Sequence, residues 1–371
     1  MKIVLLSGAV KNAGDYLITH RTRELLKTVY PDAEIKVMIR NNPMNEERFA
    51  TLNSADLAVI GGGPVYKWDL YPSWLPLAGT LEEVKPKLAI VGGGWYGSNT
   101  DEDEVWNYRF NESTTRLLHR VEEDTRKLGC RDYYAARVLQ SNGLSSPVMT
   151  GCPAWYDLKK IGKRLEKAPE IHRIAVSDPA DVRHNGEQSM RICEFLKQKY
   201  PGAEFRYLFH RGTTVDRYTD QDTVNRINGM KTRLLAMGFT VHDIASGYKG
   251  FHLYDDCDLH VGHRVHAHIY NLSERKASIL IEEDARGAGV NEPLGLWGIK
   301  AYSRKKGMNA SFFVKAYNKV FDYNRENPYV VRELESVLSE LETTGFIDLN
   351  QAYARMEFYF DRMMEHLKGL M

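Results

Sequence analysis

The residues with the clearest capacity for chemistry lie in one segment, residues 258–269, which reads DLHVGHRVHAHI. Four histidines and one arginine fall within nine residues, where a strand-like run turns at Gly262 into a helical one. Imidazole exchanges protons near neutral pH, and guanidinium binds carboxylates and phosphates through paired hydrogen bonds. This density of polar groups is not typical of a generic core, and we expect the segment to bind an anion.

A metal centre is the main alternative for this segment. His260, His263 and His266 are spaced three apart, and three aspartates lie between residues 255 and 258. Such side chains are common metal ligands. However, His260 is expected to end a strand, so the three histidines need not share a helical face, and Arg264 would repel a cation. We therefore favour an anion site and predict no metal; a solvated basic helix start is a second alternative.

A polar turn follows the first apolar run of the chain. Asn12, Gly14 and Asp15 come after residues 2–6 and open a helical stretch. At this position a parallel sheet presents backbone N–H groups to an anion. A helix cap formed by Asp15 is the simpler alternative.

Two glycine runs, residues 61–63 and 92–94, each follow an apolar run directly. Neither matches a dinucleotide-binding or P-loop signature. Their positions predict glycines at strand carboxyl ends, where open α/β sheets bind ligands; tight turns are the alternative. The candidate ligand contacts are Gly62, Gly63, Gly93 and Gly94.

Two further arginines lie in predicted turns. Arg131 separates two helical stretches, and Arg211 follows the apolar run 204–209. Either side chain could bind a carboxylate or a phosphate. A structural pair with an aspartate is the alternative for Arg131, and a surface loop charge is the alternative for Arg211.

The elements that must position these residues alternate between apolar runs and amphipathic stretches. This alternation predicts parallel sheets covered by helices on both faces, in two Rossmann-like halves. The expected strands are 2–6, 35–39, 56–60, 88–91, 173–177, 204–209, 239–243 and 278–282, and the expected helices include 15–29, 112–127, 133–141, 187–199 and 221–237.

A chain of 371 residues exceeds what one core usually serves, so two domains are expected. The lysine-rich segment 157–170 interrupts the strand pattern and predicts the join. We expect an N-terminal domain over residues 1–165, a C-terminal domain over 166–300, and a helical tail over 301–371 that packs back onto the first domain.

Composition excludes several classes of protein. Net charge is +1 with both signs interspersed, which argues against nucleic acid as a partner. The chain has no apolar run of the roughly 20 residues needed to cross a membrane and no signal peptide pattern. Its four cysteines lie far apart, so neither a disulfide nor a zinc site is expected. A cytoplasmic location is predicted, and a peripheral position at the inner face of the membrane is compatible with it.

In their order along the chain, these motifs resemble the polysaccharide pyruvyltransferase family. The family's Asn-x-Gly-Asp corresponds to residues 12–15, its Gly-Gly-Gly to a glycine run, its Arg-Asp turn to 131–132, and its Gly-Thr-Arg-Leu-His-Ala to 262–267. The resemblance spans roughly residues 1–285. His263 replaces the threonine and Val265 replaces the leucine, and we expect the histidine to alter the contacts around the pocket.

The resemblance implies a GT-B-like fold with the active site in the cleft between two domains. It implies phosphoenolpyruvate as donor substrate, no cofactor, and a saccharide acceptor, lipid-linked or nucleotide-linked, in the synthesis of a cell-surface polysaccharide. Asp15, Arg131, Arg264 and His266 match the family's active-site positions. With His266 as acid and Asp15 as base, or the reverse, pyruvate would be transferred to a sugar hydroxyl to form a ketal.

Two other functions stay open at this point. A GT-B glycosyltransferase with a nucleotide-sugar donor would share the fold and the glycine pattern. A non-catalytic protein that binds sugar phosphates could use the same scaffold. The acceptor sugar and the oligomeric state are not indicated by the sequence.

Overall fold

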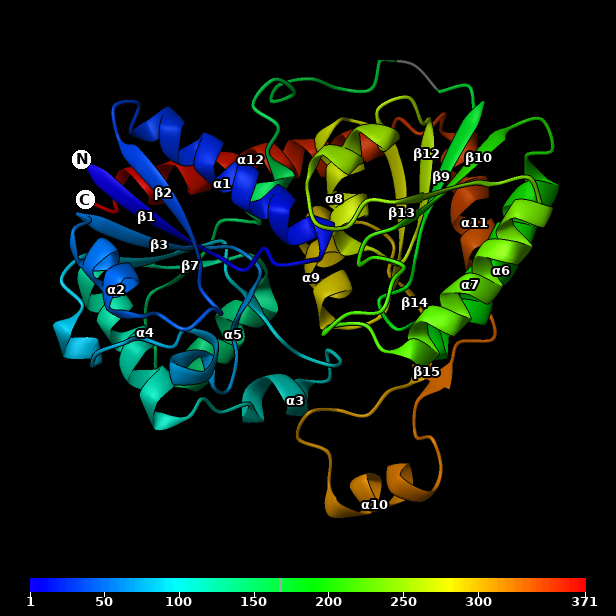
Figure 1. The fold of residues 1–371 in the computed structure, drawn as a ribbon. Coiled ribbons are helices and arrows are strands. Elements are labelled where there is room, and N and C mark those ends of the chain that lie inside the picture. Colours follow the sequence, from blue (N-terminus) through cyan, green and yellow to red (C-terminus); the bar gives the residue numbers. More distant parts are fainter. Residues whose placement is uncertain (167–168) are drawn as a thin grey trace. The chain divides into compact units, whose positions relative to one another are not determined.

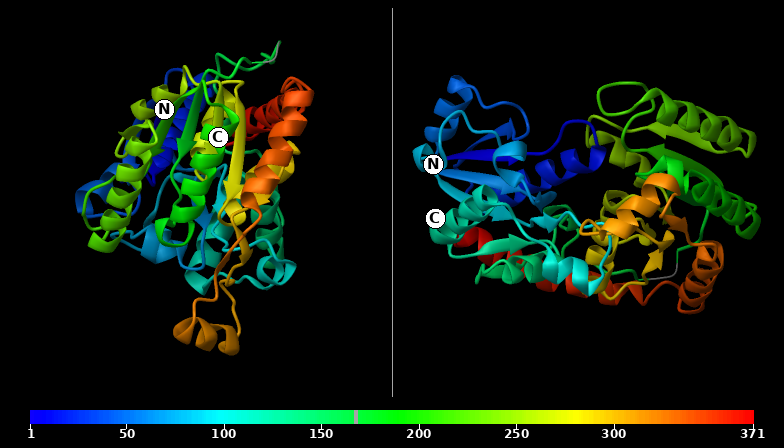
Figure 2. Two further views of the ribbon diagram at one scale, coloured as in Figure 1. Left: turned by 90° about the vertical axis from the view of Figure 1, so that its right-hand side faces the viewer. Right: turned by 90° about the horizontal axis from the view of Figure 1, so that it is seen from below.

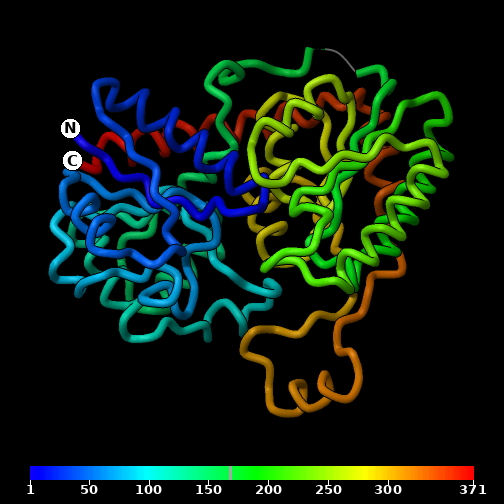
Figure 3. Tube along the Cα trace, viewed as in Figure 1, coloured from blue at the N-terminus to red at the C-terminus, as the bar shows by residue number. Residues whose placement is uncertain are grey.

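The fold is described here from a computed structural model, over residues 1–166 and 169–371 (Figure 1). Contacts divide the chain into two compact units. Unit 1 comprises Met1–Val10, Asp15–Tyr156 and Met356–Met371, and unit 2 comprises Lys11–Gly14 and Asp157–Arg355. Each unit therefore combines segments that are distant in the sequence, as the trace in Figure 3 shows.

Unit 1 is built on a parallel sheet with the strand order β2-β1-β3-β5. The next strand, β7, continues this sheet through a parallel bridge between Gly93 and Cys130 and pairs with β8. All five residues of β3 are buried, as expected for a strand covered on both faces. The strands are β1 (Lys2–Ser7), β2 (Glu34–Ile39), β3 (Leu57–Gly61), β5 (Lys87–Val91), β7 (Leu128–Cys130) and β8 (Pro147–Met149).

The helices of unit 1 follow its strands in the βαβ manner. For example, α4 begins at the cap Asn111, whose side chain accepts from the N–H of Thr114, and it buries Leu117, Leu118 and Val121. The helices are α1 (Ala13–Val29), α2 (Glu46–Asn53), α3 (Glu102–Asn107), α4 (Glu112–Thr125) and α5 (Tyr133–Ser141), with the short strands β4 (Pro64–Tyr66) and β6 (Gly94–Trp95) and the turns η1 (Leu70–Trp74), η2 (Leu81–Glu83) and η3 (Pro153–Trp155).

Unit 2 has a six-stranded parallel sheet in the order β11-β10-β9-β12-β13-β14. Numbered from the first strand of the unit, this is the order 3-2-1-4-5-6 of the doubly wound dinucleotide-binding fold. The order reverses between β9 and β12, and ligands of such sheets bind at the carboxyl ends beside this point. The strands are β9 (Arg173–Ser177), β10 (Glu204–Phe209), β11 (Thr240–Asp243), β12 (Leu259–Gly262), β13 (Ala277–Glu282) and β14 (Ile299–Lys300).

The helices of unit 2 include one that stands apart from the sheet. An excursion formed by β15, α10 and β16 extends away from the rest of this unit in Figure 1 and in the left-hand view of Figure 2. The elements are α6 (Val182–Lys199), α7 (Gln221–Ala236), η4 (Lys249–Tyr254), α8 (Val265–Ser273), α9 (Ala285–Leu294), β15 (Tyr302–Arg304), α10 (Phe312–Val320), β16 (Arg325–Glu326) and α11 (Val330–Thr343).

The last helix, α12 (Leu349–Lys368), contributes its second half to unit 1. There the imidazole Nε2 of His366 bonds the carbonyl of Ile90 at 3.0 Å, and the hydroxyl of Tyr30 donates to the carbonyl of Leu367 at 2.6 Å. Tyr359 also pairs with Tyr133 through their hydroxyls. Residues 356–371 are thus an integral part of the first unit.

The predicted fold class is confirmed, with two α/β halves of parallel strands and a helical C-terminal region. All four cysteines are free and buried. Of the helices in the described part of the chain, none is both long and apolar enough to cross a membrane. Two residues of the lysine-rich segment, 167 and 168, lie outside the described residues.

Candidate functional site

The histidine-rich segment lies at the point where the strand order of unit 2 reverses. Ser177 ends β9, Gly262 ends the neighbouring β12, and the two residues pair in register. A Cβ atom at Gly262 would lie 2.4 Å from the hydroxyl oxygen of Ser177, so only glycine allows this approach. The close contact carries the following residues, Arg264 and His266, to the ligand-binding edge of the sheet.

Arg264 is held in place by a buried carboxylate that the sequence did not indicate. Its Nε donates to Oδ1 of Asp178 at 2.7 Å, and its Nη2 donates to Oδ2 at 2.5 Å and to the carbonyl of Pro179 at 3.1 Å. Burial raises the pKa of Asp178, and the charge of Arg264 opposes this. The bidentate pair fixes the guanidinium and leaves the N–H groups of Nη1 as those available to a ligand.

His266 lies in the first turn of α8, half-buried, beside Val265. Gly14 is packed directly on its ring, because a Cβ atom at Gly14 would lie 2.1 Å from Nδ1 of His266. The structure therefore brings the Gly14 and His266 motifs together within unit 2.

Segment 11–14 has further attachments to unit 2. The amide of Ala13 donates to the carbonyl of His210 at 3.0 Å, and the ammonium of Lys11 pairs with Asp216 at 2.7 Å. The amide of Ser246 donates to the carbonyl of Lys11. Asn12 belongs to this anchored segment, whereas Asp15, which follows the segment directly, belongs to unit 1.

Two of the four histidines are core residues. Both ring nitrogens of His260 bond hydroxyls, those of Ser278 at 2.8 Å and Ser177 at 2.9 Å, and His268 shares Ser278 through its Nδ1. Burial lowers the pKa of His260 well below its usual range and that of His268 to about 3. Both imidazoles are therefore neutral at pH 7 and serve the packing of β12 against β13.

His263 is also buried, and its Nε2 bonds the side-chain oxygen of Gln188 at 3.0 Å. Burial lowers its pKa to about 4, although the carboxylate of Glu283 opposes this shift. In the same neighbourhood, His210 bonds the hydroxyl of Tyr254 at 2.7 Å and is also held neutral, first by burial and then by the charge of Arg264. Arg211, next in the chain, is exposed in the loop after β10.

The described residues do not support the alternative of a metal cluster. Over residues 1–166 and 169–371, no three His, Cys, Asp or Glu side chains converge in a way that could hold a metal ion. His260 and His268 direct ring nitrogens to serine hydroxyls, and Arg264 lies between His263 and His266 in the turn. The side chains of His260, His263 and His268 are thus bonded within unit 2.

Arg131 lies at the carboxyl edge of the unit 1 sheet, directly after β7. Its amide donates to the carbonyl of Gly93 at 2.7 Å, and its Nε contacts Oδ2 of Asp132 at 3.2 Å. Asp132 also caps α5 through the amide of Ala135. The guanidinium is 1% exposed, yet its Nη2 has no hydrogen-bond partner within the described residues.

Arg40 is a second buried arginine at this edge, and it belongs to no sequence motif. It follows β2 directly, and its amide donates to the carbonyl of Ser7 at 2.8 Å. Its Nε and Nη1 are buried without a hydrogen-bond partner in the described part of the chain. Burial lowers its pKa to about 10, and the negative charge of Asp15 opposes this. Its position directly after a strand, like that of Arg131, places it at the carboxyl edge of the sheet, but this position does not show that it is buried.

The glycine runs divide into packing positions and positions beside the arginines. A Cβ atom at Gly94 would lie 2.3 Å from Nη2 of Arg131, and one at Gly63 would lie 3.8 Å from Nη2 of Arg40. Gly62 and Gly93 instead face apolar side chains, Ile18 and Val65 respectively. Gly94 thus makes room for the guanidinium of Arg131, whereas a Cβ atom at Gly63 would be in ordinary contact with Arg40.

Electrostatic coupling links the arginines with Asp15. Burial raises the pKa of the Cys152 thiol to about 11, while Arg131 lowers it and Asp15 raises it. Because the charge of Asp15 also raises the pKa of Arg40, Asp15 and the two arginines share one electrostatic environment at the carboxyl edge of unit 1. Buried cations with unsatisfied N–H groups favour binding of an anion.

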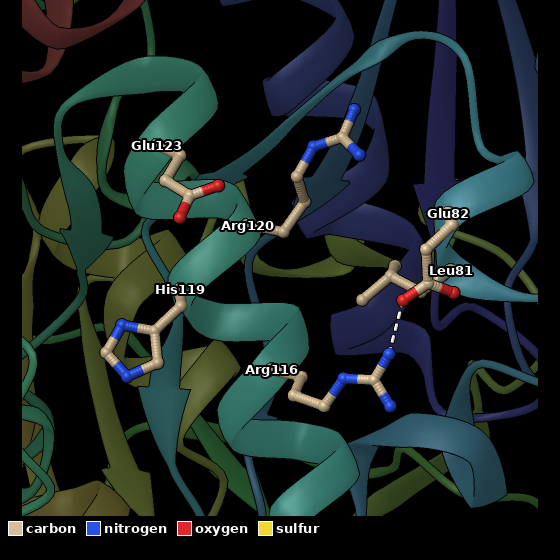
Figure 4. A pocket seen from close by; sticks show the side chains of 6 residues that line it. All are labelled: Leu81, Glu82, Arg116, His119, Arg120 and Glu123. Carbon is tan, nitrogen blue, oxygen red and sulfur yellow. Dashed lines mark hydrogen bonds and ion pairs between the residues drawn. The ribbon is translucent and has the colours of Figure 1, made fainter.

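A shallow pocket of about 330 Å³ lies elsewhere on unit 1 and does not coincide with these residues (Figure 4). Arg116 and Glu82 form an ion pair across it, drawn as a dashed line. Helix α4 lines the pocket, and its Asp124 accepts a hydrogen bond from the amide of Leu88. The pocket therefore lies near the amino end of β5. That is the opposite edge from the glycine runs, and we assign no role to it. The pocket is lined by Leu81, Glu82, Arg116, His119, Arg120 and Glu123.

Comparisons with known proteins agree with this architecture. The sequence profile of the polysaccharide pyruvyl transferase family matches residues 12–284. The structure is similar to S. aureus MnaA in a co-structure with UDP, with 13% identity, a TM-score of 0.55, and coverage of 99% of this chain and 96% of that chain. It is also similar to a structure from Listeria monocytogenes that is described as a UDP-N-acetylglucosamine 2-epimerase. The identity is 10%, the TM-score is 0.53, and the match covers 98% of this chain and 94% of that chain. At these identities the likeness shows the fold alone, and it confirms the predicted GT-B-like class. No curated protein matches the sequence.

Proposed function

Because the chain belongs to the polysaccharide pyruvyl transferase family, we propose that its donor is phosphoenolpyruvate and that it forms a pyruvate ketal on a sugar of a cell-surface polysaccharide or its precursor. Family membership establishes a transferase that acts on polysaccharide. The donor, the ketal product and the roles of individual residues belong to the proposal.

One observation carries the choice of donor. Arg40 and Arg131 are buried at one sheet edge, and both keep guanidinium nitrogens without hydrogen-bond partners among the described residues. A buried cation in this state is costly unless an anion completes its hydrogen bonds. Phosphoenolpyruvate carries a carboxylate and a phosphate, the two anions that guanidinium groups bind best. The arginines are thus suited to a small dianionic donor.

Proton transfer is assigned to His266 by comparison with its neighbours. His260, His263 and His268 are buried, bonded to serine or glutamine side chains, and held neutral by lowered pKa values. His266 is only half-buried, in the first turn of α8 at the ligand-binding edge of the sheet. It is therefore our candidate general acid.

In the proposed reaction the acid protonates the methylene carbon of the donor, which gives an oxocarbenium-like carbon. A sugar hydroxyl attacks this carbon and its proton passes to a base, for which Asp15 is the candidate. The C–O bond to phosphate then breaks, and a second hydroxyl of the sugar closes the ketal and releases the last proton. His266 and Asp15 can exchange roles between these steps. Arg264, fixed by Asp178, would stabilise the phosphate as it leaves.

Exposed aromatic side chains in unit 1 support a saccharide acceptor. Trp68, Trp74 and Tyr96 are exposed, and the ammonium of Lys67 lies 3.2 Å from the ring centroid of Trp74 and 4.5 Å from that of Tyr96. Sugar faces stack on such rings. Trp95 is 1% exposed and belongs to the core.

The proposal is tested first by ligand stabilisation. A donor that binds only the folded state at a hundred times its Kd raises the unfolding free energy by about 2.7 kcal/mol. We expect phosphoenolpyruvate to raise the melting midpoint of the wild type and not of Arg131→Ala. UDP-N-acetylglucosamine is the control donor, because one structural neighbour is a UDP co-structure.

Activity is then measured as release of inorganic phosphate from phosphoenolpyruvate in the presence of saccharide acceptors. Stabilisation by UDP-N-acetylglucosamine alone, with no phosphate release, would favour a nucleotide-sugar transferase. If phosphoenolpyruvate stabilises both the wild type and His266→Asn, and the wild type shows no turnover with any acceptor, the results would favour a binding protein.

A further inference from the structure

The excursion of unit 2, residues 302–326, carries an exposed aromatic helix. Its base is a two-stranded antiparallel pair in which Tyr302 faces Glu326. No residue of α10 is buried, and Phe312, Phe313 and Val320 are 79%, 81% and 73% exposed. The excursion extends away from the sheet of its unit (Figures 1 and 2). Large apolar side chains gathered on one exposed helix mark an interaction surface.

The helix is amphipathic and basic. At 100° per residue, Phe312, Phe313 and Val320 share one arc of α10, and Lys315 and Lys319 occupy the arc that adjoins it beside Phe312. The side chain of Ser311 caps its first turn. Between residues 304 and 320 the chain has five basic and no acidic residues, although its total charge is only +1. The positive charge of this segment is therefore concentrated locally.

The excursion is tied to the ligand-binding edge of the unit 2 sheet. It begins after β14, and the ammonium of Lys305 donates to the carbonyl of Glu283 at the end of β13. On the return path, Asp322 pairs with His184 at the start of α6 at 2.6 Å. Arg264 and His266 follow β12 at the same edge. The aromatic helix and the candidate catalytic residues thus belong to one end of unit 2.

We propose that α10 and the basic residues beside it bind the surface of an anionic lipid bilayer. The phenylalanines would enter the interface between headgroups and acyl chains, and the exposed Arg304, Lys315 and Lys319 would contact anionic headgroups. If the proposed function holds, this contact brings the catalytic edge of unit 2 to an acceptor carried on a lipid.

The charge pattern favours a bilayer over a second copy of the chain. Two copies meeting through α10 would bring Lys315 and Lys319 of one copy against the same lysines of the other, which disfavours the contact. Binding to an anionic surface is instead strengthened by each basic residue that reaches it.

Sedimentation of the full chain with vesicles tests this surface. The vesicles are pure phosphatidylcholine, or phosphatidylcholine and phosphatidylglycerol at about three to one. We expect binding to the anionic vesicles only, weakened about tenfold or more by Phe312→Glu/Phe313→Glu and several-fold by Lys315→Gln/Lys319→Gln or added salt. All four side chains are exposed, so the variants should keep the wild-type melting midpoint, which is checked first.

Matched controls come from the same unit. Leu235→Glu/Ile347→Glu replaces two apolar side chains that are 61% and 47% exposed, and Lys159→Gln/Lys249→Gln removes two exposed lysines. Both controls should bind as the wild type does. The proposal is overturned if the wild type binds neither vesicle, if the controls weaken binding as much as the α10 variants, or if α10 mediates self-association instead. Binding is measured without phosphoenolpyruvate, so failure of the donor proposal leaves this result intact.

Discussion

Replacement of Arg40 by methionine should separate ligand binding from stability. Arg40 is 5% exposed, and its Nε and Nη1 have no hydrogen-bond partner within the described residues. Burial lowers its pKa to about 10, which corresponds to a penalty of about 3 kcal/mol on the charged form. Methionine keeps most of the buried volume and removes the unsatisfied donors.

Without ligand, Arg40→Met should therefore be at least as stable as the wild type, and more stable by up to about 1–3 kcal/mol. With phosphoenolpyruvate, the wild type should gain stability and Arg40→Met should not. Denaturant unfolding with and without the donor gives both quantities.

Arg48 provides the matched control. It lies on α2 in the same unit, and its guanidinium donates to the carbonyls of Pro43 and Ile39 at 2.8 and 2.5 Å. Arg48→Met should lose about 1 kcal/mol without ligand and keep the full effect of the donor. The reasoning about Arg40 is refuted if Arg40→Met destabilises the free protein as Arg48→Met does and still responds to phosphoenolpyruvate.

Three further outcomes follow from the geometry of unit 2. Gly14→Ala would place a Cβ atom 2.1 Å from Nδ1 of His266; displacement of the ring should lower turnover about a hundredfold, measured by phosphate release, while the donor still shifts the melting midpoint. His266→Asn should lower turnover by about 10²–10⁴ with little loss of stability, whereas His260→Asn should lower the unfolding free energy by about 1–3 kcal/mol; equal effects of the two on turnover in folded protein would contradict the assignment. His184 bonds Asp181 and Asp322, and these bonds raise its pKa although burial opposes the charge. The stabilisation that a raised folded pKa provides is fully present below the ordinary value of 6.5, and it is lost as pH rises through the folded pKa. His184→Gln should therefore lower the unfolding free energy near about pH 6 and change it little near about pH 9. Thermal unfolding in a pH series measures this difference.

The fold class could be predicted because its signal is local. Apolar runs such as residues 57–61 and 277–282 are buried along their whole length, and amphipathic helices separate them. The strand order could not be predicted in this way. The pairing of β9 with β12 depends on a contact between Ser177 and Gly262, residues far apart in the sequence.

The candidate site was predictable where a motif carried it and not elsewhere. The turn around Arg264 was found from its sequence, but its partner Asp178 lies after a different strand and belongs to no motif. Arg40 follows a strand of mixed polarity, KVMI preceded by EI, and nothing in that pattern separates a buried arginine from a solvated one. Trp95 and Trp68 occupy similar glycine-rich surroundings in the sequence, yet only the first is buried.

The return of the last helix to unit 1 has a consequence for synthesis on the ribosome. Residues 356–371 emerge after the whole of unit 2, and until then the carbonyl of Ile90 lacks its bond from His366 and the hydroxyl of Tyr30 lacks the carbonyl of Leu367. Unit 2, apart from segment 11–14, is continuous in the sequence and can fold first. Until residues 356–371 are synthesised, part of the apolar surface of the N-terminal sheet stays exposed. We therefore expect unit 1 to be the half of this protein that depends more on chaperones during translation.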